Sequence, residues 1–369
     1  MAEIVFLIFV SIAGLTFLIY LVLSILFSVY KPQHIDEGYL PPVSIVIAAR
    51  NACDKLKILI PKLLDQKYPE LEVVLVNDRS TDETYETYIV EAKENLRLKF
   101  INIEETPAHI NEKKFAITLG IRAAKSDIIL LTDADCEPIH ENWVSRMIQP
   151  FKDEKVMFSL GYSQYNVKKG FLNGFIRFET MLTAFTYFGL ALVGLPYMGV
   201  GRNLAYRKSF FLSKNGFGRF QSILGGDDDL FVNQYASRKN TKVVMHFEAT
   251  TFSEPKTSLG DFIIQKTRHL SVGKHYKNTD KLILGLILLL KYAFFGTFVA
   301  ALALQFKPIE VVICFIIAML TYLISLYILK QKTGDPSKPW LIPVFDVLYL
   351  FYYIFILLKV KLTRKVKWS

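Results

Sequence analysis

Cysteine is scarce in this sequence. The 369 residues include only Cys53, Cys136 and Cys314, and these are not spaced as zinc ligands or as the pairs of a disulfide framework. A disulfide-stabilised secreted fold is therefore excluded, and a reducing compartment is expected. The sequence also has no internal repeat and no low-complexity segment.

Charged residues are nearly missing from four long stretches. Hydrophobic residues make up 52% of the chain. They concentrate in residues 4–30, 282–304, 311–329 and 341–358. The first three stretches are long enough to cross a bilayer as helices, whereas the fourth is broken by Pro343 and Asp346. We expect a membrane anchor over residues 1–30, a polar linker over 31–40, and a C-terminal membrane region of two to three apolar helices over 281–360.

The first apolar stretch has the features of an uncleaved anchor. Glu3 is the only charge before it, so the basic region of a signal peptide is lacking. The stretch is also longer than the apolar part of most signal peptides, and no small-x-small cleavage site follows it. A cleaved signal peptide is the less favoured alternative.

The net charge of +10 is partly concentrated at the C-terminus. Five basic residues and no acid follow the last apolar stretch: Lys359, Lys361, Arg364, Lys365 and Lys367. A basic cluster next to a membrane segment is typical of a cytoplasmic tail that faces anionic lipid, here residues 361–369. A nucleic-acid partner is not expected, because these residues are not organised on a folded module.

The mixed-polarity part of the chain alternates between strand and helix patterns. Short β-branched runs predict strands, and segments with helical spacing follow them after short connections. The strands are expected at 43–49, 71–77, 98–103 and 127–132, and the helices at 54–66, 81–95 and 112–125. This order predicts an α/β domain with a parallel sheet over residues 41–280. In such sheets ligands bind beyond the carboxyl ends of the strands.

Polar side chains follow three of these predicted strands. Asn51 follows the first, Asp78 the second, and Asp133 and Asp135 the fourth. Two carboxylates one residue apart repel each other unless a cation or hydrogen-bond donors compensate. A divalent cation with oxygen ligands does this, and Mg²⁺ often bridges to substrate phosphates. The position after a buried strand, more than the D-x-D pattern itself, predicts a metal site here.

Three consecutive acids, Asp227 to Asp229, follow a Gly-Gly pair. They allow two interpretations. Acidic residues favour the start of a helix because of the helix dipole. Alternatively, one carboxylate is a general base that takes a proton from an attacking hydroxyl.

Two further segments also allow two interpretations. In a predicted helix over residues 259–277, Gln265 shares a face with Arg268 and His269, which is either a diphosphate-binding face or a solvated polar face. Residues 171–197 are apolar and aromatic, but Arg177 and Glu179 interrupt them. This segment is either a core helix of the domain or an interfacial segment on the bilayer.

Taken in order, seven motifs resemble those of family 2 glycosyltransferases, and especially of their membrane-bound, synthase-like members. They are PPVSIVIAARN, VLVNDRSTDET, NEKKFAITLGI, LLTDADCEP, GVGRNLAYRKSFF, GGDDDLF and QKTRHL. They extend over roughly residues 41–277. The resemblance implies a GT-A fold, which is the Rossmann-like α/β fold of nucleotide-diphospho-sugar transferases, with membrane helices on both sides. It also implies inverting transfer from a nucleotide sugar.

The resemblance assigns roles to individual residues. A divalent cation, Mg²⁺ or Mn²⁺, is implied at Asp135 and Asp133. The catalytic base is implied at Asp227 or Asp228; counting back from Leu230 favours Asp227, and a G-D-D pattern favours Asp228. The implied nucleotide-sugar-binding residues are Ala49, Asn51, Asp78, Lys114, Asp133, Gln265 and Arg268.

One position departs from the family pattern. His269 stands where the family's Q-x-x-R-W motif has Trp, which stacks on the acceptor sugar in processive members. This departure weakens the prediction of a processive polysaccharide synthase, which would also need a translocation channel. A nucleotide-binding scaffold or transporter is a second alternative, against which the acids of the predicted base and metal sites argue.

The favoured prediction is an integral protein of the cell membrane that transfers a sugar to a lipid or lipid-linked glycan. Its catalytic domain is expected in the cytoplasm, where nucleotide sugars are made. Under this topology a fourth crossing segment would place the basic tail outside. Residues 341–358 are therefore expected to form an interfacial or re-entrant segment.

Overall fold

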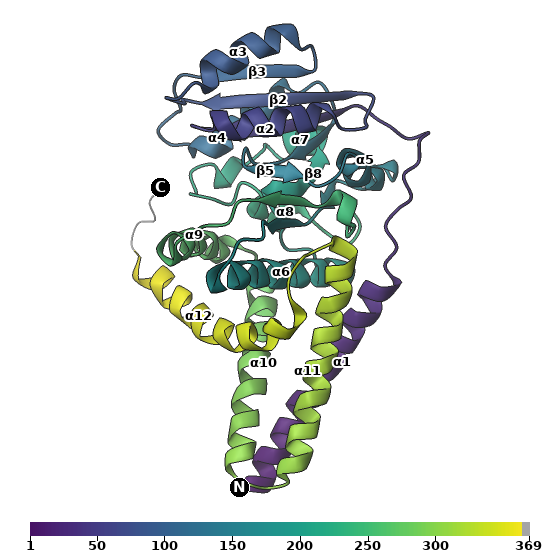
Figure 1. Ribbon diagram of the computed structural model, residues 1–369, viewed down its shortest axis with the longest axis vertical. Coiled ribbons are helices and arrows are strands. Elements are labelled where there is room, and N and C mark those ends of the chain that lie inside the picture. Colours follow the sequence, from purple (N-terminus) through teal and green to yellow (C-terminus); the bar gives the residue numbers. More distant parts are fainter. Residues whose placement is uncertain (364–369) are drawn as a thin grey trace.

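The computed structural model describes residues 1–363 and consists of an α/β domain above a group of long helices (Figure 1). Three basic residues of the predicted tail, Arg364, Lys365 and Lys367, lie outside the described residues.

The domain is built on a seven-stranded sheet with the order β3-β2-β1-β4-β8-β6-β9. Its strands are β1 (Val43–Ala49), β2 (Leu71–Asp78), β3 (Leu98–Ile103), β4 (Ile128–Leu131), β6 (Phe158–Leu160), β8 (Leu204–Arg207) and β9 (Thr241–Val243). The four strands β1 to β4 are parallel, as predicted, whereas β8 runs antiparallel to both β4 and β6. A second sheet has the order β5-β10-β7, with β5 (Cys136–Pro138), β10 (Thr251–Ser253) and β7 (Ser163–Tyr165).

Strand β1 shows why its sequence is continuously apolar. Ile45 and Ile47 pack into the core on one face of the sheet, and Val46 packs into the core on the other. A strand buried on both faces has no place for a polar side chain until it ends. Because Ala49 pairs with Asn77 in a parallel register, the residues that follow β1 and β2 meet at one edge.

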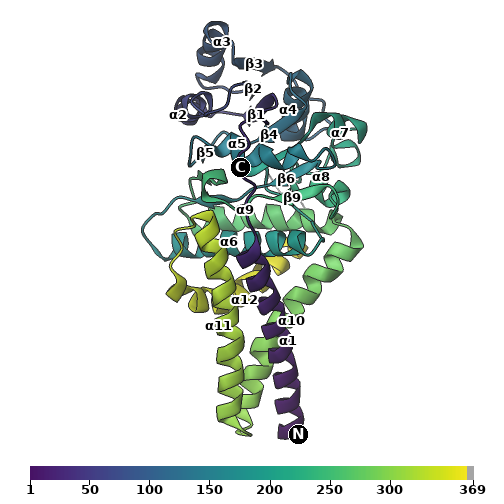
Figure 2. The ribbon, with the colours of Figure 1, turned by 90° about the vertical axis from the view of Figure 1, so that its right-hand side faces the viewer.

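Helices cover both faces of the large sheet (Figures 1 and 2). They are α2 (Cys53–Leu64), α3 (Thr84–Glu94), α4 (Glu112–Ala123), α5 (Trp143–Ile148), α6 (Phe171–Leu192), α7 (Lys208–Ser213), α8 (Asp229–Tyr235) and α9 (Leu259–Val272). Helix α9 is shorter than predicted, because the chain tightens into a 3₁₀ turn from Gly273 to His275. The predicted helices α2, α3 and α4 are confirmed with small differences at their ends.

Helix α6 lies between the sheet and the long helices (Figure 1). Its buried residues include Asn173, Arg177 and Glu179, the polar residues that interrupt its apolar sequence. The helix contacts β7 and β9 above and α1, α11 and α12 below. It is therefore a core helix, and it joins the α/β domain to the helical part.

Four helical segments are long and apolar enough to cross a membrane. They are α1 (Ala2–Val29), α10 (Asn278–Ala303), α11 (Pro308–Thr333) and the segment Pro339–Leu362, which contains α12 (Ile342–Leu362). Helices α1, α10 and α11 extend together away from the domain, whereas α12 runs across its base beneath α9 and α6 (Figures 1 and 2).

The fourth apolar stretch forms one uninterrupted helix although Pro343 and Asp346 interrupt its apolar sequence. Pro343 lies in the first turn of α12, where a missing backbone N–H is tolerated, so the helix continues without interruption. Asp346 is buried in an ion pair with Lys291 of α10.

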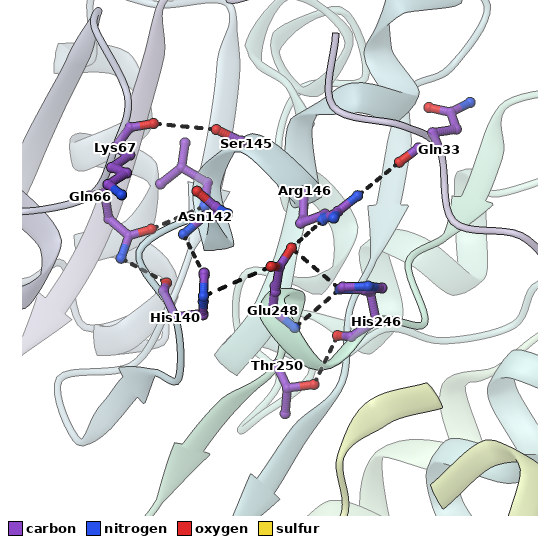
Figure 3. Close-up of polar contacts among 11 residues, drawn as sticks. Gln33, Gln66, Lys67, His140, Asn142, Ser145, Arg146, His246, Glu248 and Thr250 are labelled. Carbon is purple, nitrogen blue, oxygen red and sulfur yellow. Dashed lines mark hydrogen bonds and ion pairs between the residues drawn. The ribbon is translucent and has the colours of Figure 1, made fainter. Parts of the chain in front are cut away.

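A polar cluster joins the linker to the domain (Figure 3). Arg146 Nε donates to Glu248 Oε2 at 2.6 Å, and Arg146 Nη1 donates to the Gln33 carbonyl at 3.2 Å. Thr250 Oγ1 donates to the Thr333 carbonyl at 3.0 Å. These bonds hold the linker and the end of α11 against the domain.

Candidate active site

The residues predicted to bind the nucleoside meet at the ends of β1 and β2. Asn51 adopts a left-handed backbone with φ of 50°, which lets its N–H donate to Ser80 Oγ at 2.9 Å while its Oδ1 accepts from the Thr81 N–H at 2.7 Å. Asp78 is buried and accepts from Arg79 Nε at 2.9 Å. The loops after β1 and β2 are thereby held together, with Ala49 as the last residue of β1.

The D-x-D acids lie in the turn between β4 and β5. Ligand atoms of Asp133, Asp135 and Cys136 all lie within 4.8 Å of one another. The carboxylates suit a hard divalent cation, whereas burial raises the pKa of the Cys136 thiol well above its usual range, which disfavours a thiolate. Two carboxylates on a partly open turn therefore fit Mg²⁺ or Mn²⁺, with the thiol as a neighbour.

Lys113 joins the two acidic groups. Its Nζ lies 2.8 Å from Asp133 Oδ1 and 2.9 Å from Asp227 Oδ2. Burial acts to lower the pKa of Lys113, but the charges of these two acids outweigh it, and the pKa lies well above its usual value. The metal-site acid and the acidic triplet are therefore parts of one site.

The family resemblance implied that Lys114 binds the nucleotide sugar, but its side chain points to a different partner. Its buried Nζ donates to the carbonyls of Phe220, Ile223 and Gly225 at 2.8, 2.7 and 2.6 Å. These bonds use all three donors of the ammonium group. Lys114 thus shapes the loop that leads to Asp227, and Lys113 is the lysine that reaches the acids.

The acidic triplet divides into three different roles. Asp228 caps α8: its Oδ1 accepts from the Asp229 N–H at 2.8 Å, and its Oδ2 accepts from the Gly201 N–H at 2.6 Å. Asp229 accepts from Tyr276 Oη at 2.6 Å, and burial together with Asp228 raises the pKa of Asp229 to about 8. Asp227 pairs with Lys113.

The protonation states of Asp227 and Asp228 also differ. Burial acts to raise the pKa of Asp227, but the charge and hydrogen bond of Lys113 outweigh it, so the pKa lies below its usual value. Burial, and then the charge of Asp227, raise the pKa of Asp228. Asp227 is therefore the acid of this pair that is kept ionised and able to accept a proton.

Helix α9 brings its polar face to the same region. Gln265 Nε2 donates to Tyr165 Oη at 3.4 Å, and Lys266 forms a buried ion pair with Glu179 of α6. The His269 ring is exposed, but it faces the inside of a cavity formed by the protein. This desolvation, together with the charges of Lys266 and Arg268, lowers the pKa of His269 well below its usual value, so the imidazole is neutral.

A large cavity connects these groups to the helical part of the molecule. Its volume is about 1580 Å³. Asp133, Asp135, Lys113 and Asp227 line one end. Side chains of α1, α6, α10, α11 and α12 line the other end, where most of the surface is apolar. Of the predicted site residues, Gln265 and Arg268 line it as well, whereas Ala49, Asn51 and Asp78 lie outside it.

Three residues of this region were not predicted from the sequence. Lys113 was not chosen because its neighbour Lys114 has the same charge and lies in the same motif, and only the fold shows which of them reaches the acids. Arg202 and Tyr165 line the cavity, with the Arg202 guanidinium 4.5 Å above the Tyr165 ring. Arg202 lies in the GVGRN motif, but its isolated position gave no indication of a partner.

Residues 44–212 match the profile described as Glycosyl transferase family 2. These residues of the chain therefore form a glycosyltransferase family 2 domain. The matched range runs from β1 to α7, so it includes Asp78, Asp133 and Asp135 and ends before Asp227.

Curated relatives of this glycosyltransferase include two staphylococcal enzymes. The poly-beta-1,6-N-acetyl-D-glucosamine synthase of Staphylococcus aureus (strain MSSA476) is 28% identical over 135 residues, which are 37% of this chain and 31% of the relative. The Staphylococcus epidermidis enzyme of the same name is 31% identical over 110 residues, 30% of this chain and 25% of the relative. The chain thus matches less than a third of the length of these relatives.

A solved structure has a similar fold. The mannosyltransferase PcManGT from Pyrobaculum calidifontis, solved with GDP-Man and Mn²⁺, superposes with a TM-score of 0.58 at 17% identity, over 92% of this chain and 100% of that one. The GT-A fold predicted for the glycosyltransferase is confirmed.

Proposed function

We propose that this glycosyltransferase moves a sugar, with inversion, from a nucleotide diphosphate sugar to an acceptor hydroxyl at the membrane surface. The observation that carries the proposal is the bridge from Asp133 through Lys113 to Asp227 in one cavity, which supports a metal ligand at Asp133 and a base at Asp227. A nucleotide-binding scaffold has no use for that base.

The donor end of the site is formed by the strand ends. Ala49, Asn51 and Asp78 are positioned to contact the nucleoside, and Asp133 and Asp135 would hold a divalent cation against the diphosphate. Such a cation stabilises the negative charge that grows on the leaving diphosphate. The relative PcManGT was solved with Mn²⁺ and a nucleotide sugar, which supports this arrangement.

Asp227 is the proposed base. The acceptor oxygen forms a bond to the anomeric carbon, and the bond from that carbon to the diphosphate oxygen breaks, with its electron pair leaving on the diphosphate. The hydroxyl proton moves to the Asp227 carboxylate. Asp228 is less suited, because both its oxygens accept backbone N–H groups.

The acceptor end of the cavity supports a lipid-borne acceptor. The apolar lining between α1, α6, α10 and α12 suits hydrocarbon, and it leads directly to the carboxylates. We propose that the catalytic domain is cytoplasmic, so that the donor reaches the site from the compartment in which it is made.

A processive synthase is the second candidate, because the curated relatives are polysaccharide synthases. His269 stands where the stacking Trp of processive members is expected, which favours transfer of single sugars. The length of the product separates the two candidates.

The experiment that tests the proposal is a panel of radiolabelled nucleotide sugars, incubated with the purified protein and a membrane lipid extract. We expect one donor to give a labelled lipid product in the presence of Mg²⁺ or Mn²⁺. Asp135→Ala and excess chelator should each abolish the product. Full activity in chelator would contradict the metal site, and no labelled product from any donor would contradict the proposed function.

A further inference from the structure

Arg202 is a cation in the cavity that the proposed transfer does not use. It lies in the 3₁₀ turn Gly201–Asn203, with its guanidinium 4.5 Å above the Tyr165 ring. Its Nη1 donates to Ser253 Oγ at 2.8 Å. Within residues 1–363, no ion pair joins it to a carboxylate. The two nearby acids, Asp133 and Asp135, are the expected ligands of the divalent metal ion.

The backbone ties Arg202 to the base. The Gly201 N–H donates to Asp228 Oδ2 at 2.6 Å, so Arg202 and Asp227 are the chain neighbours of a hydrogen-bonded pair. A Cβ atom on Gly201 would lie 3.2 Å from the Asp228 Cβ atom, so a larger residue there would crowd this approach. Arg202 and Asp227 both line the cavity.

The guanidinium is held ready for a ligand. Tyr165 forms a platform beneath it, and Gln265 Nε2 donates to the Tyr165 hydroxyl at 3.4 Å. Apart from the bond to Ser253, the described residues provide no hydrogen-bond acceptor for it. The planar fork of an arginine matches a phosphate group.

The partners of Arg202 extend from the D-x-D turn, where Ser253 pairs with Cys136, towards the helical part of the molecule. Tyr165, Ser253 and Gln265 belong to β7, β10 and α9, and α9 packs against α12 at the base of the domain (Figure 1). The residues proposed for the nucleoside lie instead at the ends of β1 and β2. The donor diphosphate already has the Asp133 and Asp135 site.

We propose that Arg202, stacked on Tyr165, binds the phosphate of an anionic lipid acceptor, and that a neighbouring hydroxyl of the same lipid is the nucleophile. This inference rests on the proposed function. A hydroxyl is required because Asp227 accepts its proton, whereas an ionised phosphate oxygen would attack without a base. The acceptor class is thus a lipid that carries a phosphate within a few bonds of a free hydroxyl.

Two lipids that differ only in the phosphate test this inference. The full-length protein is placed in phosphatidylcholine nanodiscs with the nucleotide sugar that the donor panel identifies, and release of nucleoside diphosphate is followed. Lysophosphatidylglycerol and the monoacylglycerol with the same acyl chain are titrated, and the concentration that gives half of the maximal change in rate is compared. We expect this concentration to be at least about tenfold lower for the phospholipid.

Three variants test whether Arg202 causes the preference for the phospholipid. Arg202→Gln should remove the tenfold preference, and Arg202→Lys should keep part of it, because it retains charge but loses the fork. Arg219→Gln is the matched control: Arg219 also stacks on a ring, that of Phe220 at 6.0 Å, but it is exposed and does not line the cavity. It should keep the full preference. Thermal unfolding of each variant shows that it is folded.

Several results would overturn the inference. One is an equal response of the wild type to both lipids. Another is a folded Arg202→Gln protein that keeps the preference; if its donor KM rises at the same time, Arg202 serves the donor diphosphate instead. Inorganic phosphate as potent as the lysophospholipid would indicate a free-phosphate site rather than a lipid acceptor. Absence of nucleoside diphosphate release by the wild type with every donor would refute the proposed function itself.

Discussion

At the scale of single residues, Asp227 and Asp228 are adjacent but are expected to respond differently to the same substitution. Asp227→Asn removes the proton acceptor, so turnover should fall by at least about a hundredfold while donor binding changes little. Asp228→Asn keeps one acceptor for two backbone N–H groups, so it should mainly destabilise the start of α8, by about 1 kcal/mol. Turnover, nucleotide binding by calorimetry and thermal unfolding measure these effects. Near-normal turnover of Asp227→Asn would contradict the assignment of the base.

Neighbouring residues also mark the limit of what the sequence reveals. The sequence was sufficient to place acids at the ends of β2 and β4, because buried parallel strands must end where polar residues begin. It was not sufficient to choose between Lys113 and Lys114. Both have the same charge and motif, and the choice depends on which of them meets the carbonyls of residues 220–225. Those carbonyls come from a loop more than a hundred residues away in the chain.

At the scale of secondary structure, α10 and α12 are joined by the buried pair of Lys291 and Asp346. Tyr322 of α11 also donates to Asp346 Oδ1, at 3.0 Å. Asp346→Leu alone leaves a buried ammonium without its partner, and Lys291→Met alone leaves a buried carboxylate. Each single substitution should lower the free energy of unfolding by about 3–5 kcal/mol.

The double variant Lys291→Met with Asp346→Leu is the control for this pair. Replacing both charges by apolar groups removes the unpaired ion, so most of the lost stability should return. Thermal unfolding in the same detergent measures all four proteins. A double variant as unstable as the single ones would show that the unpaired charge is not the cause of the lost stability.

The 3₁₀ turn η4 (Phe247–Ala249) lies in the polar cluster of Figure 3 and allows a second test. His246 caps this turn, since its Nδ1 accepts from the Glu248 N–H at 3.2 Å. Burial, and then the charge of Arg146, lower the pKa of His246; His140 and Lys332 act in the same direction, and Glu248 opposes them. The folded state therefore favours the neutral imidazole. Its stabilising contribution is present above the usual pKa of 6.5 and is lost as the pH falls below that value.

His246→Asn isolates this effect, because the asparagine oxygen can also cap the turn but does not titrate. Between about pH 7 and about pH 5, the unfolding temperature of the wild type should fall more than that of His246→Asn. Equal falls for the two proteins would show that another group causes the acid sensitivity.

Elements that the sequence did not predict are mostly short. β6, β8 and β9 have three or four residues each, too few to show a period of two. Their places in the sheet come from long-range pairing: β8 pairs with β4, β6 with β8, and β9 with β6. The course of α12 was also open, because an apolar helix has the same composition whether it crosses a bilayer or lies across the base of a domain.

At the scale of the whole molecule, one cavity joins the sheet edge to the long helices, so the side of the membrane on which the domain lies decides which donor can reach it. Basic residues on both sides of α12 and the lack of paired cysteines favour the cytoplasm. A cysteine at the exposed position Lys239, in the domain, should therefore resist a membrane-impermeant thiol reagent in intact cells. It should react after the cells are opened.

The opposite end of the molecule provides the control for this topology. Glu310 is exposed in the first turn of α11, and the connection from α10 to α11 lies at the far end of the long helices from the domain (Figure 1). Glu310→Cys should react in intact cells if α1, α10 and α11 cross the bilayer with the domain inside. The wild type should give only background labelling, because Cys53 and Cys136 are buried and Cys314 is partly buried within α11. Labelling of Lys239→Cys together with protection of Glu310→Cys would reverse the orientation. The donor would then have to be supplied on the outer side, contrary to the proposed function.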